Sequence, residues 1–263
     1  MNDLYIHLLN MSLLPLRLGR FLFNRNKLKI KKINESLLQN SYGSSYSPKK
    51  IISWNIQELF FYTNVSKVNN IVGRLKSFDA DTVCLQEVFE DRAKEVIINE
   101  LRDKYPYFLL GHTKKKYIIG EDSGLLILSR YPIEFVKENL LKDPRLPDSL
   151  ANKTVLYFKI GNLNFATTHL QSSYSDISEK QLLSLVNNSP FDNFIIIGDL
   201  NNTNADKILD INKNNICNTY EDCILDYIIN IGYKDINIEV ESIEINIKNT
   251  TDHLPIIGKI KSQ

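Results

Sequence analysis

The sequence predicts an α/β fold of two mixed β-sheets packed face to face, with helices on the outside. Short apolar or alternating runs bounded by turn residues recur along the chain and indicate strands. Long segments with apolar residues at helical spacing come early, whereas later strands follow one another directly, as at 153–160 and 163–169. Strands joined without a helix do not fit a singly wound parallel sheet, so this mixture favours two packed sheets.

The expected helices and strands begin at residue 51. In residues 65–78 the apolar side chains are spaced three or four positions apart, which is typical of a helix that buries one face. The stretch 200–222 is rich in Asn and Asp, and we expect loops there with at most one short helix. We expect helices at 65–78, 91–104 and 177–188, and strands at 51–56, 81–86, 124–130, 153–160, 163–169, 193–198, 224–229 and 255–260.

Residues 1–49 are expected to lie outside a catalytic domain at 50–263, because residues 41–50 have the Ser, Gly and Pro content of a linker. The segment 4–23 is apolar, but Pro15 and two arginines interrupt it, which makes it a poor membrane span and a poor secretion signal. The simpler expectation is that this segment packs on the domain or forms a loose tail. Because basic residues follow it directly, the alternative is an apolar helix that lies on an anionic membrane surface.

Charge and cysteine content narrow the class of protein. The 263-residue chain has a formal net charge of +1, whereas proteins that hold long nucleic acids usually carry a basic excess. Its three cysteines, Cys84, Cys217 and Cys223, form no CxxC pair, which argues against a disulfide framework or a zinc site. We expect an intracellular, cytoplasmic protein without an obligate protein partner, and peripheral membrane contact through 4–23 is the alternative for its location.

Polar side chains stand at the ends of almost all expected strands. Strand ends are where a rigid scaffold presents side chains to a shared cleft. Converging carboxylates repel one another unless a cation lies between them, and their hard oxygen ligands favour Mg²⁺ or Mn²⁺ over zinc. The residues in these positions are Asn55, Glu87, His169, Asp199, Asn201, Asp226, Asp252 and His253.

Each of these residues alone has a simpler structural interpretation. Glu87 fits a solvated strand exit, Asn55 a turn, Asp199 a helix N-cap, Asp252 an Asx turn, and His169 a partly buried histidine with its hydrogen bonds satisfied. Their occurrence together, in this order, favours a catalytic site.

The ordered set resembles the endonuclease/exonuclease/phosphatase superfamily, which includes deoxyribonucleases, abasic-site endonucleases, inositol polyphosphate 5-phosphatases and neutral sphingomyelinases. The resemblance implies a four-layer α/β sandwich and a metal-dependent phosphoric ester hydrolase in which water attacks phosphorus without a covalent intermediate. The strings that carry it are SWNI, DTVCLQEVFE, SGLLILSRYPI, ATTHL, IIIGDLN, ILDYI and TDHLP, within residues 51–260.

The resemblance also implies roles on the metal and water sides of the site. Glu87, Asn55 and Asp252 would hold the metal, which polarises a phosphoryl oxygen. His253 would orient or deprotonate the attacking water, and Asp226 would fix the tautomer of its imidazole.

The remaining residues would act on the phosphoryl group. His169 and Asn201 would donate hydrogen bonds to its non-bridging oxygens, and Asp199 would position the nucleophile or assist the leaving group. The choice of general base between Asp199 and His253 stays open. Lys153, in the string ANKTV, would lie near the phosphate, and its structural alternative is a solvated lysine.

The substrate class divides between lipid and nucleic acid. The strings QEVFE and SGLLILSRYPI resemble the sphingomyelinase branch, which predicts a phospholipid such as sphingomyelin. The strings SWNIQELF and LQEV are similar to phosphodiesterases that remove tyrosyl adducts from DNA ends, and Lys114, Lys115 and Lys116 fit a nucleic-acid backbone contact. Two less favoured functions are an inositol-lipid phosphatase and a catalytically inactive binding module.

Overall fold

The structure, a computed structural model of the whole chain, describes residues 47–58, 64–111, 121–211, 218–246 and 250–262. The apolar segment 4–23, residues 41–46 of the expected linker, the three lysines at 114–116 and Cys217 lie outside the described residues. Within the described ranges, Cys84 and Cys223 are both free thiols. Every helix in these ranges is too short or too polar to span a membrane.

Two β-sheets form the centre of the molecule, as predicted. The first sheet has the strand order β10-β11-β1-β2-β4-β3 and the second β5-β6-β7-β8-β9. The pairs β1/β2 and β7/β8 are parallel and the other neighbours antiparallel, so both sheets are mixed. The strands are β1 (Lys50–Glu58), β2 (Thr82–Val88), β3 (Tyr107–Leu110), β4 (Leu126–Ser129), β5 (Glu134–Leu140), β6 (Thr154–Ile160), β7 (Leu163–His169), β8 (Phe194–Asp199), β9 (Asp226–Ile231), β10 (Ile236–Ser242) and β11 (Ile256–Ser262).

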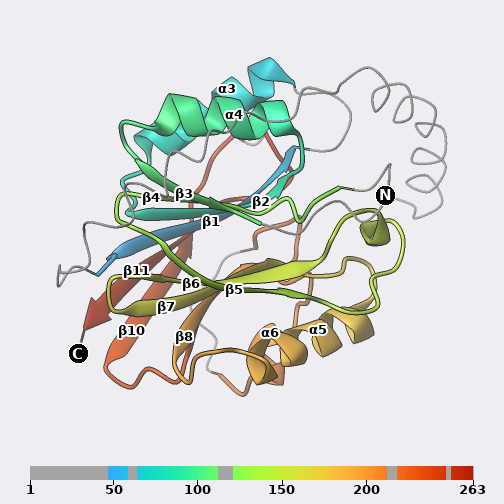
Figure 1. The fold of residues 1–263 in the computed structure, drawn as a ribbon. Helices are drawn as coiled ribbons and strands as arrows, with labels where there is room; N and C mark the ends of the chain where they lie inside the picture. The colour runs from blue at the N-terminus through green and yellow to red at the C-terminus, as the bar shows by residue number, and fades with distance from the viewer. Residues whose placement is uncertain (1–46, 59–63, 112–120, 212–217, 247–249, 263) are drawn as a thin grey trace.

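Helices cover the outer faces of both sheets and complete four layers (Figure 1). Helices α3 and α4 lie over the first sheet, and α5 and α6 lie over the second. Each outer helix buries its apolar stripe, and the four-layer sandwich implied by the family resemblance is confirmed. The helices are α3 (Val65–Ser77), α4 (Asp91–Leu101), α5 (Ser175–Asn187), α6 (Ala205–Ile208) and the 3-10 turn η1 (Asp148–Leu150).

Side chains from both sheets interdigitate to form the central core. Ile51 and Cys84 of the first sheet pack in one cluster with Phe158, Phe165 and Ile197 of the second. The rings of Phe158 and Phe165 are stacked, with centroids 5.3 Å apart. Burial of aromatic and branched side chains between the sheets holds them as one body, so residues at the ends of either sheet keep fixed relative positions.

The sequence did not predict three strands, and all three lie at sheet edges. β3 and β10 are the two edges of the first sheet, and β5 is an edge of the second. Edge strands are half covered and need no continuous apolar run. In β5, for example, no residue is fully buried. The strands that the sequence predicted are the central ones and β9. Burial on both faces gives the central strands a clear apolar run, and β9 has such a run as well because four of its six residues are buried.

Candidate active site

Strand register brings three of the predicted side chains to one end of the second sheet. His169 of β7 lies opposite Asp199 of β8, and Asp199 lies opposite Asp226 of β9. Gly198 permits this alignment: it has φ +149°, and a Cβ at its position would lie 2.0 Å from the Thr168 carbonyl oxygen. The close approach of β7 and β8 therefore requires glycine before Asp199.

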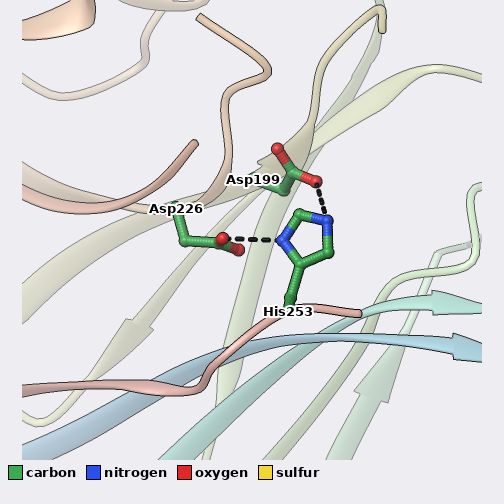
Figure 2. A group of neighbouring side chains, drawn as sticks. All are labelled: Asp199, Asp226 and His253. Atoms are coloured by element: carbon green, nitrogen blue, oxygen red, sulfur yellow. Dashed lines mark hydrogen bonds and ion pairs between the residues drawn. The ribbon is translucent and has the colours of Figure 1, made fainter. Parts of the chain in front are cut away.

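His253 and Asp226 form a buried hydrogen-bonded pair (Figure 2). The Nδ1 of His253 is 2.8 Å from Asp226 Oδ2, and its Nε2 faces Asp199 Oδ2 at 3.8 Å. The backbone of His253 is fixed as well, because Trp54 Nε1 donates a hydrogen bond to its carbonyl oxygen at 3.0 Å. Burial is the largest single cause and lowers the pKa of His253, but the charge and hydrogen bond of Asp226, together with the charges of Asp199 and Asp252, outweigh it and raise that pKa to about 10.

Asn55 links the ends of the two sheets. Its Nδ2 donates hydrogen bonds to Glu87 Oε1 at 3.2 Å and to Asp199 Oδ2 at 3.0 Å. Glu87 is the last residue but one of β2 and has a left-handed φ of 56°; its carboxylate faces His169 of the second sheet. Burial raises the pKa of Glu87, since few donors replace the water it has lost.

His169 and Asn201 flank these carboxylates. His169 Nε2 lies 3.6 Å from Glu87 Oε1 and 3.7 Å from Asp199 Oδ2. Burial and the charge of Lys153 hold the pKa of His169 well below its usual range, so its imidazole is neutral. Asn201 donates its backbone N–H to Asp199 Oδ1 at 2.9 Å, and its Nδ2 donates to the Leu170 carbonyl oxygen. One amide hydrogen of Asn201 is thus already engaged by the backbone.

Lys153 is buried, so the alternative of a solvated lysine is wrong. Its side chain is 3% exposed, and Nζ lies 2.5 Å from Asp148 Oδ1 and 3.0 Å from the Leu170 carbonyl oxygen. Burial raises the pKa of Asp148, but the charge of Lys153, together with the charge of His169 and the hydrogen bonds from Lys153 and Ser172, outweighs it, so the net shift of the pKa is downward. The ammonium is held beside the site, where its charge acts on both His169 and Glu87.

Asp252 lies on the side of the site formed by the first sheet. Its Oδ2 accepts a hydrogen bond from Gln57 Nε2 at 2.7 Å. Its negative charge raises the pKa of Glu87, although burial is the larger cause, so the two carboxylates share one electrostatic environment. The structure therefore brings all eight predicted strand-end residues, with Lys153, into one region at the ends of the two sheets.

Three further residues of this region were not predicted from the sequence. Asp148 precedes Lys153 by five positions, and Gln57 follows Asn55 by two within the string SWNIQ. Tyr220 comes from the loop before β9; its ring centroid lies 4.8 Å from that of His253. Gln57 lies inside one of the family-like strings and could have been found there, but neither Asp148 nor Tyr220 carried a sequence signal.

The site has an excess of buried negative charge. The ligand atoms of Asp199, Asp226 and His253 all lie within 4.8 Å of one another. Asp226 Oδ1 is buried and has no hydrogen-bond partner among the described residues. Burial, followed by the charge of Asp226, raises the pKa of Asp199 to about 7. Carboxylates this crowded and dry suit a hard divalent cation as counter-charge.

Comparison with known proteins assigns the fold a family. The Endonuclease/Exonuclease/phosphatase family matches residues 52–210. Sphingomyelinase C 2 of Leptospira interrogans is 27% identical over 204 residues, covering 60% of this chain and 33% of that protein. Phospholipase C of Staphylococcus aureus is 28% identical over 110 residues, covering 36% of this chain and 33% of that protein. The chain thus spans about a third of the length of these relatives.

Solved structures share the fold over most of the chain. A beta toxin variant of Staphylococcus aureus with bound magnesium ions superposes with a TM-score of 0.66 at 19% identity, covering 82% of this chain and 100% of that one. Sphingomyelinase C of Streptomyces griseocarneus gives 0.66 at 17% identity, with 81% and 99% covered. Humanized D. rerio TDP2 gives 0.62 at 18% identity, with 82% and 100% covered. With its family match over more than half its length, the chain belongs to the endonuclease/exonuclease/phosphatase family.

Proposed function

We propose that this chain is a divalent-metal-dependent phosphodiesterase that cleaves a phospholipid of the sphingomyelin type by direct attack of water on phosphorus. The observation that carries the proposal is the buried His253–Asp226 pair beside Asp199, facing Glu87 and Asn55 of the other sheet. A proton-handling pair opposite a carboxylate–amide pair is the arrangement that metal-assisted hydrolysis requires.

Glu87, Asn55 and Asp252 are the residues proposed to hold Mg²⁺ or Mn²⁺. Glu87 is a buried carboxylate whose pKa is raised by desolvation, so a cation beside it would relieve an existing cost. Asp199, Asp226 and His253 also lie close enough to share an ion, but His253 already uses Nδ1 to bind Asp226. We therefore place the metal on the Glu87 side, where it would supply a Lewis acid for a phosphoryl oxygen.

The pKa values of Asp199 and His253 support a division of proton handling between them. The surrounding carboxylates, Asp226 above all, raise the pKa of His253 to about 10, whereas burial, followed by the charge of Asp226, raises the pKa of Asp199 to about 7. Asp199 is the better proton acceptor at neutral pH, and charged His253 is suited to orient the water and stabilise the phosphoryl oxygens. A fall in turnover as Asp199 becomes protonated, below about pH 7, would support this division; a rate independent of pH from 5 to 8 would contradict it.

His169 and Asn201 are proposed to act on the non-bridging oxygens. The neutral imidazole of His169 is available to donate one hydrogen bond, and Asn201 keeps one amide hydrogen beyond that given to Leu170. Lys153, held between Asp148 and Leu170, adds a fixed positive charge near the phosphate. Such preorganised donors stabilise negative charge that grows in the transition state.

The lipid substrate is supported by the named sphingomyelinase relatives and by the near-neutral net charge. A DNA-end phosphodiesterase is the second candidate, favoured by the fold shared with TDP2. A catalytically inactive module is disfavoured, because none of the carboxylates and imidazoles of the site is replaced.

A substrate panel tests the proposal. The full chain is incubated with Mg²⁺, or with EDTA, and with sphingomyelin micelles, plasmid DNA, abasic and tyrosyl-capped oligonucleotides, and inositol phosphates. We expect hydrolysis of sphingomyelin with Mg²⁺ and none with EDTA. Cleavage of DNA alone, weakened by salt, would replace the lipid proposal with the nuclease one. No hydrolysis of any substrate, together with no Mg²⁺ binding by calorimetry, would establish the inactive module.

A further inference from the structure

Gln57, the residue that follows the WNI string, contacts two residues of the proposed metal site that come from different segments of the chain. Its Nε2 donates a hydrogen bond to Asp252 Oδ2 at 2.7 Å, and its backbone N–H donates to Asn55 Oδ1 at 3.0 Å. Asn55 and Asp252 stand 197 positions apart in the sequence, on different segments. Gln57 thus links the side chains of these two proposed ligands, while Thr251 joins the same segments through a hydrogen bond from its Oγ1 to the Asn55 carbonyl oxygen at 2.7 Å.

The backbone of Gln57 is held in a conformation that such a role needs. Its φ is +47°, in the left-handed region that an unbranched polar residue adopts only when its surroundings impose it. Lys67 of α3 supplies the constraint by donating a hydrogen bond from Nζ to the Gln57 carbonyl oxygen at 2.5 Å. The backbone N–H and the backbone carbonyl of Gln57 therefore both bond to side chains rather than to the backbone of a neighbouring strand.

Lys67 is itself anchored. Its side chain is 15% exposed, and its ammonium lies 3.9 Å from the Glu58 carboxylate, whose side chain is 2% exposed. The position of Lys67 is set by α3, which begins after the N-cap Asn64, whose side chain accepts a hydrogen bond from the Lys67 N–H. A chain of contacts thus runs from the start of α3 through Lys67 and Gln57 to the carboxylate of Asp252.

Asp252 needs such a partner because the rest of its setting leaves it free to turn. It is half-buried, and its other described side-chain contact, from Thr251 Oγ1 to Oδ1, is long at 3.4 Å. A carboxylate that accepts one strong hydrogen bond at one oxygen still offers its other oxygen, and the remaining lone pairs, to a cation. Partners that orient ligands in this way commonly change metal affinity by about 10–100-fold when removed.

We propose that Gln57, fixed by Lys67, is a positioning residue that presents the carboxylate of Asp252 to the divalent metal. This inference rests on the proposed function, since it assumes that a metal binds beside Glu87 and Asp252. Gln57 is uncharged, so it orients the carboxylate without adding to or subtracting from the charge that attracts the cation.

The test measures Mg²⁺ affinity by titration calorimetry, with thermal unfolding in EDTA as a separate readout. Gln57→Met keeps the length of the side chain and removes both of its donors. We expect it to weaken Mg²⁺ binding about 10–100-fold while leaving the unfolding temperature in EDTA near that of the wild type. Turnover of Gln57→Met is expected to recover as Mg²⁺ is raised to saturation, because the change affects the ligand rather than the proton-handling residues.

Gln181→Met is the matched control. Gln181 of α5 is a buried glutamine, whereas Gln57 is half-buried; its Nε2 donates a hydrogen bond to the Lys142 carbonyl oxygen at 3.1 Å, and it lies on the side of the second sheet. We expect it to lower the unfolding temperature and leave Mg²⁺ affinity unchanged. If Gln57→Met does not unfold cooperatively, Gln57→Asn carries the same comparison, because Asn tolerates a left-handed φ and its shorter amide does not reach Asp252 in the same way.

The outcomes separate this inference from the proposed function. Equal Mg²⁺ affinity of wild type and Gln57→Met would overturn the positioning role and leave the metal site standing. A lower unfolding temperature in EDTA without a change in affinity would likewise reduce Gln57 to a structural residue. Absence of Mg²⁺ binding by the wild-type chain would overturn the metal-dependent function, and the positioning role with it.

Discussion

At the scale of single residues, the site depends on how burial changes the chemistry of ordinary side chains. Glu87, Asp199 and Asp226 would each be unremarkable carboxylates in water. Burial raises the pKa of Glu87 and of Asp199, whereas it lowers the pKa of the neighbouring His169. Of these three groups, Asp199, with a pKa of about 7, is the one suited to exchange a proton near neutral pH.

The His253→Ala variant is expected to lose about 10²–10³-fold in turnover, the usual contribution of one positioned donor that stabilises charge in the transition state. The fold should survive, because the substitution keeps the backbone carbonyl that accepts a hydrogen bond from Trp54 Nε1. Sphingomyelin hydrolysis with saturating Mg²⁺ measures the loss, and circular dichroism controls for folding. Turnover like that of the wild type would contradict the role of His253.

The Glu87→Gln variant is expected to require a higher Mg²⁺ concentration for half-maximal activity, because it removes a charged ligand while retaining the shape. A metal titration of initial rates measures this shift. Asp91→Asn, at the half-exposed start of α4, is a suitable control for loss of one acidic charge. An unchanged midpoint for Glu87→Gln would exclude Glu87 as a ligand.

The buried Glu58 predicts a pH dependence of stability. Burial raises its pKa from 4.5 to about 7, against the opposing attraction of Lys67. The folded protein therefore binds this proton more tightly than the unfolded chain does, and the cost of ionisation grows as pH rises from about 4.5 to about 7. Glu58→Gln cannot ionise, so its free energy of unfolding relative to the wild type is expected to increase between pH 5 and pH 8. Urea unfolding of both proteins at pH 5 and pH 8 measures the two free energies of unfolding. A difference between variant and wild type that is the same at both pH values would contradict the prediction.

At the scale of secondary-structure elements, the register of neighbouring strands decides which side chains meet. The parallel pair β7/β8 places His169 against Asp199, and the antiparallel pair β8/β9 places Asp199 against Asp226. A slip of one residue would turn these side chains to the opposite face. The elements therefore determine the site as much as the residues do.

Gly198→Ala tests this dependence on register. The new methyl group would lie 2.0 Å from the Thr168 carbonyl oxygen, so β7 and β8 must separate or shift. We expect destabilisation of about 1–3 kcal/mol or more, as for other forced overpacking, and loss of activity. Gly73→Ala, in α3 where a methyl group meets no atom within 4 Å, is the control and should retain stability. Unchanged unfolding and activity of Gly198→Ala would show that the close approach is not needed.

At the scale of the whole molecule, the two sheets contribute opposite halves of one site. Asn55 and Glu87 come from the first sheet, and His169, Asp199 and Asp226 from the second. The central core that joins the sheets thereby holds the proposed metal side against the proton-handling side. Function and stability should consequently be coupled through the metal.

Magnesium is expected to raise the unfolding temperature of the whole chain. A ligand that binds only the folded state stabilises it by about 2.7 kcal/mol at a hundredfold excess over its Kd, which corresponds to roughly 5–10 °C for a domain of this size. Scanning calorimetry with Mg²⁺ and with EDTA measures the difference. Equal unfolding temperatures would show that the folded state holds no specific Mg²⁺ ion.

The sequence by itself determined the central strands, the long helices, the two-sheet sandwich and the residues that gather at the strand ends. These features are local: apolar periodicity marks buried elements, and polar residues after such runs mark their exits. The edge strands β3, β5 and β10 left no comparable mark, since half-exposed strands need no apolar run.

Only the tertiary structure decided which residues touch. That His169 lies beside Glu87, that Tyr220 contacts His253, and that Gln57 binds Asp252 are consequences of segments far apart in the chain meeting in space. Such contacts depend on strand order and register between the sheets, which no local pattern encodes. The residue types were readable in the sequence, but their partners followed from the packing of the two sheets.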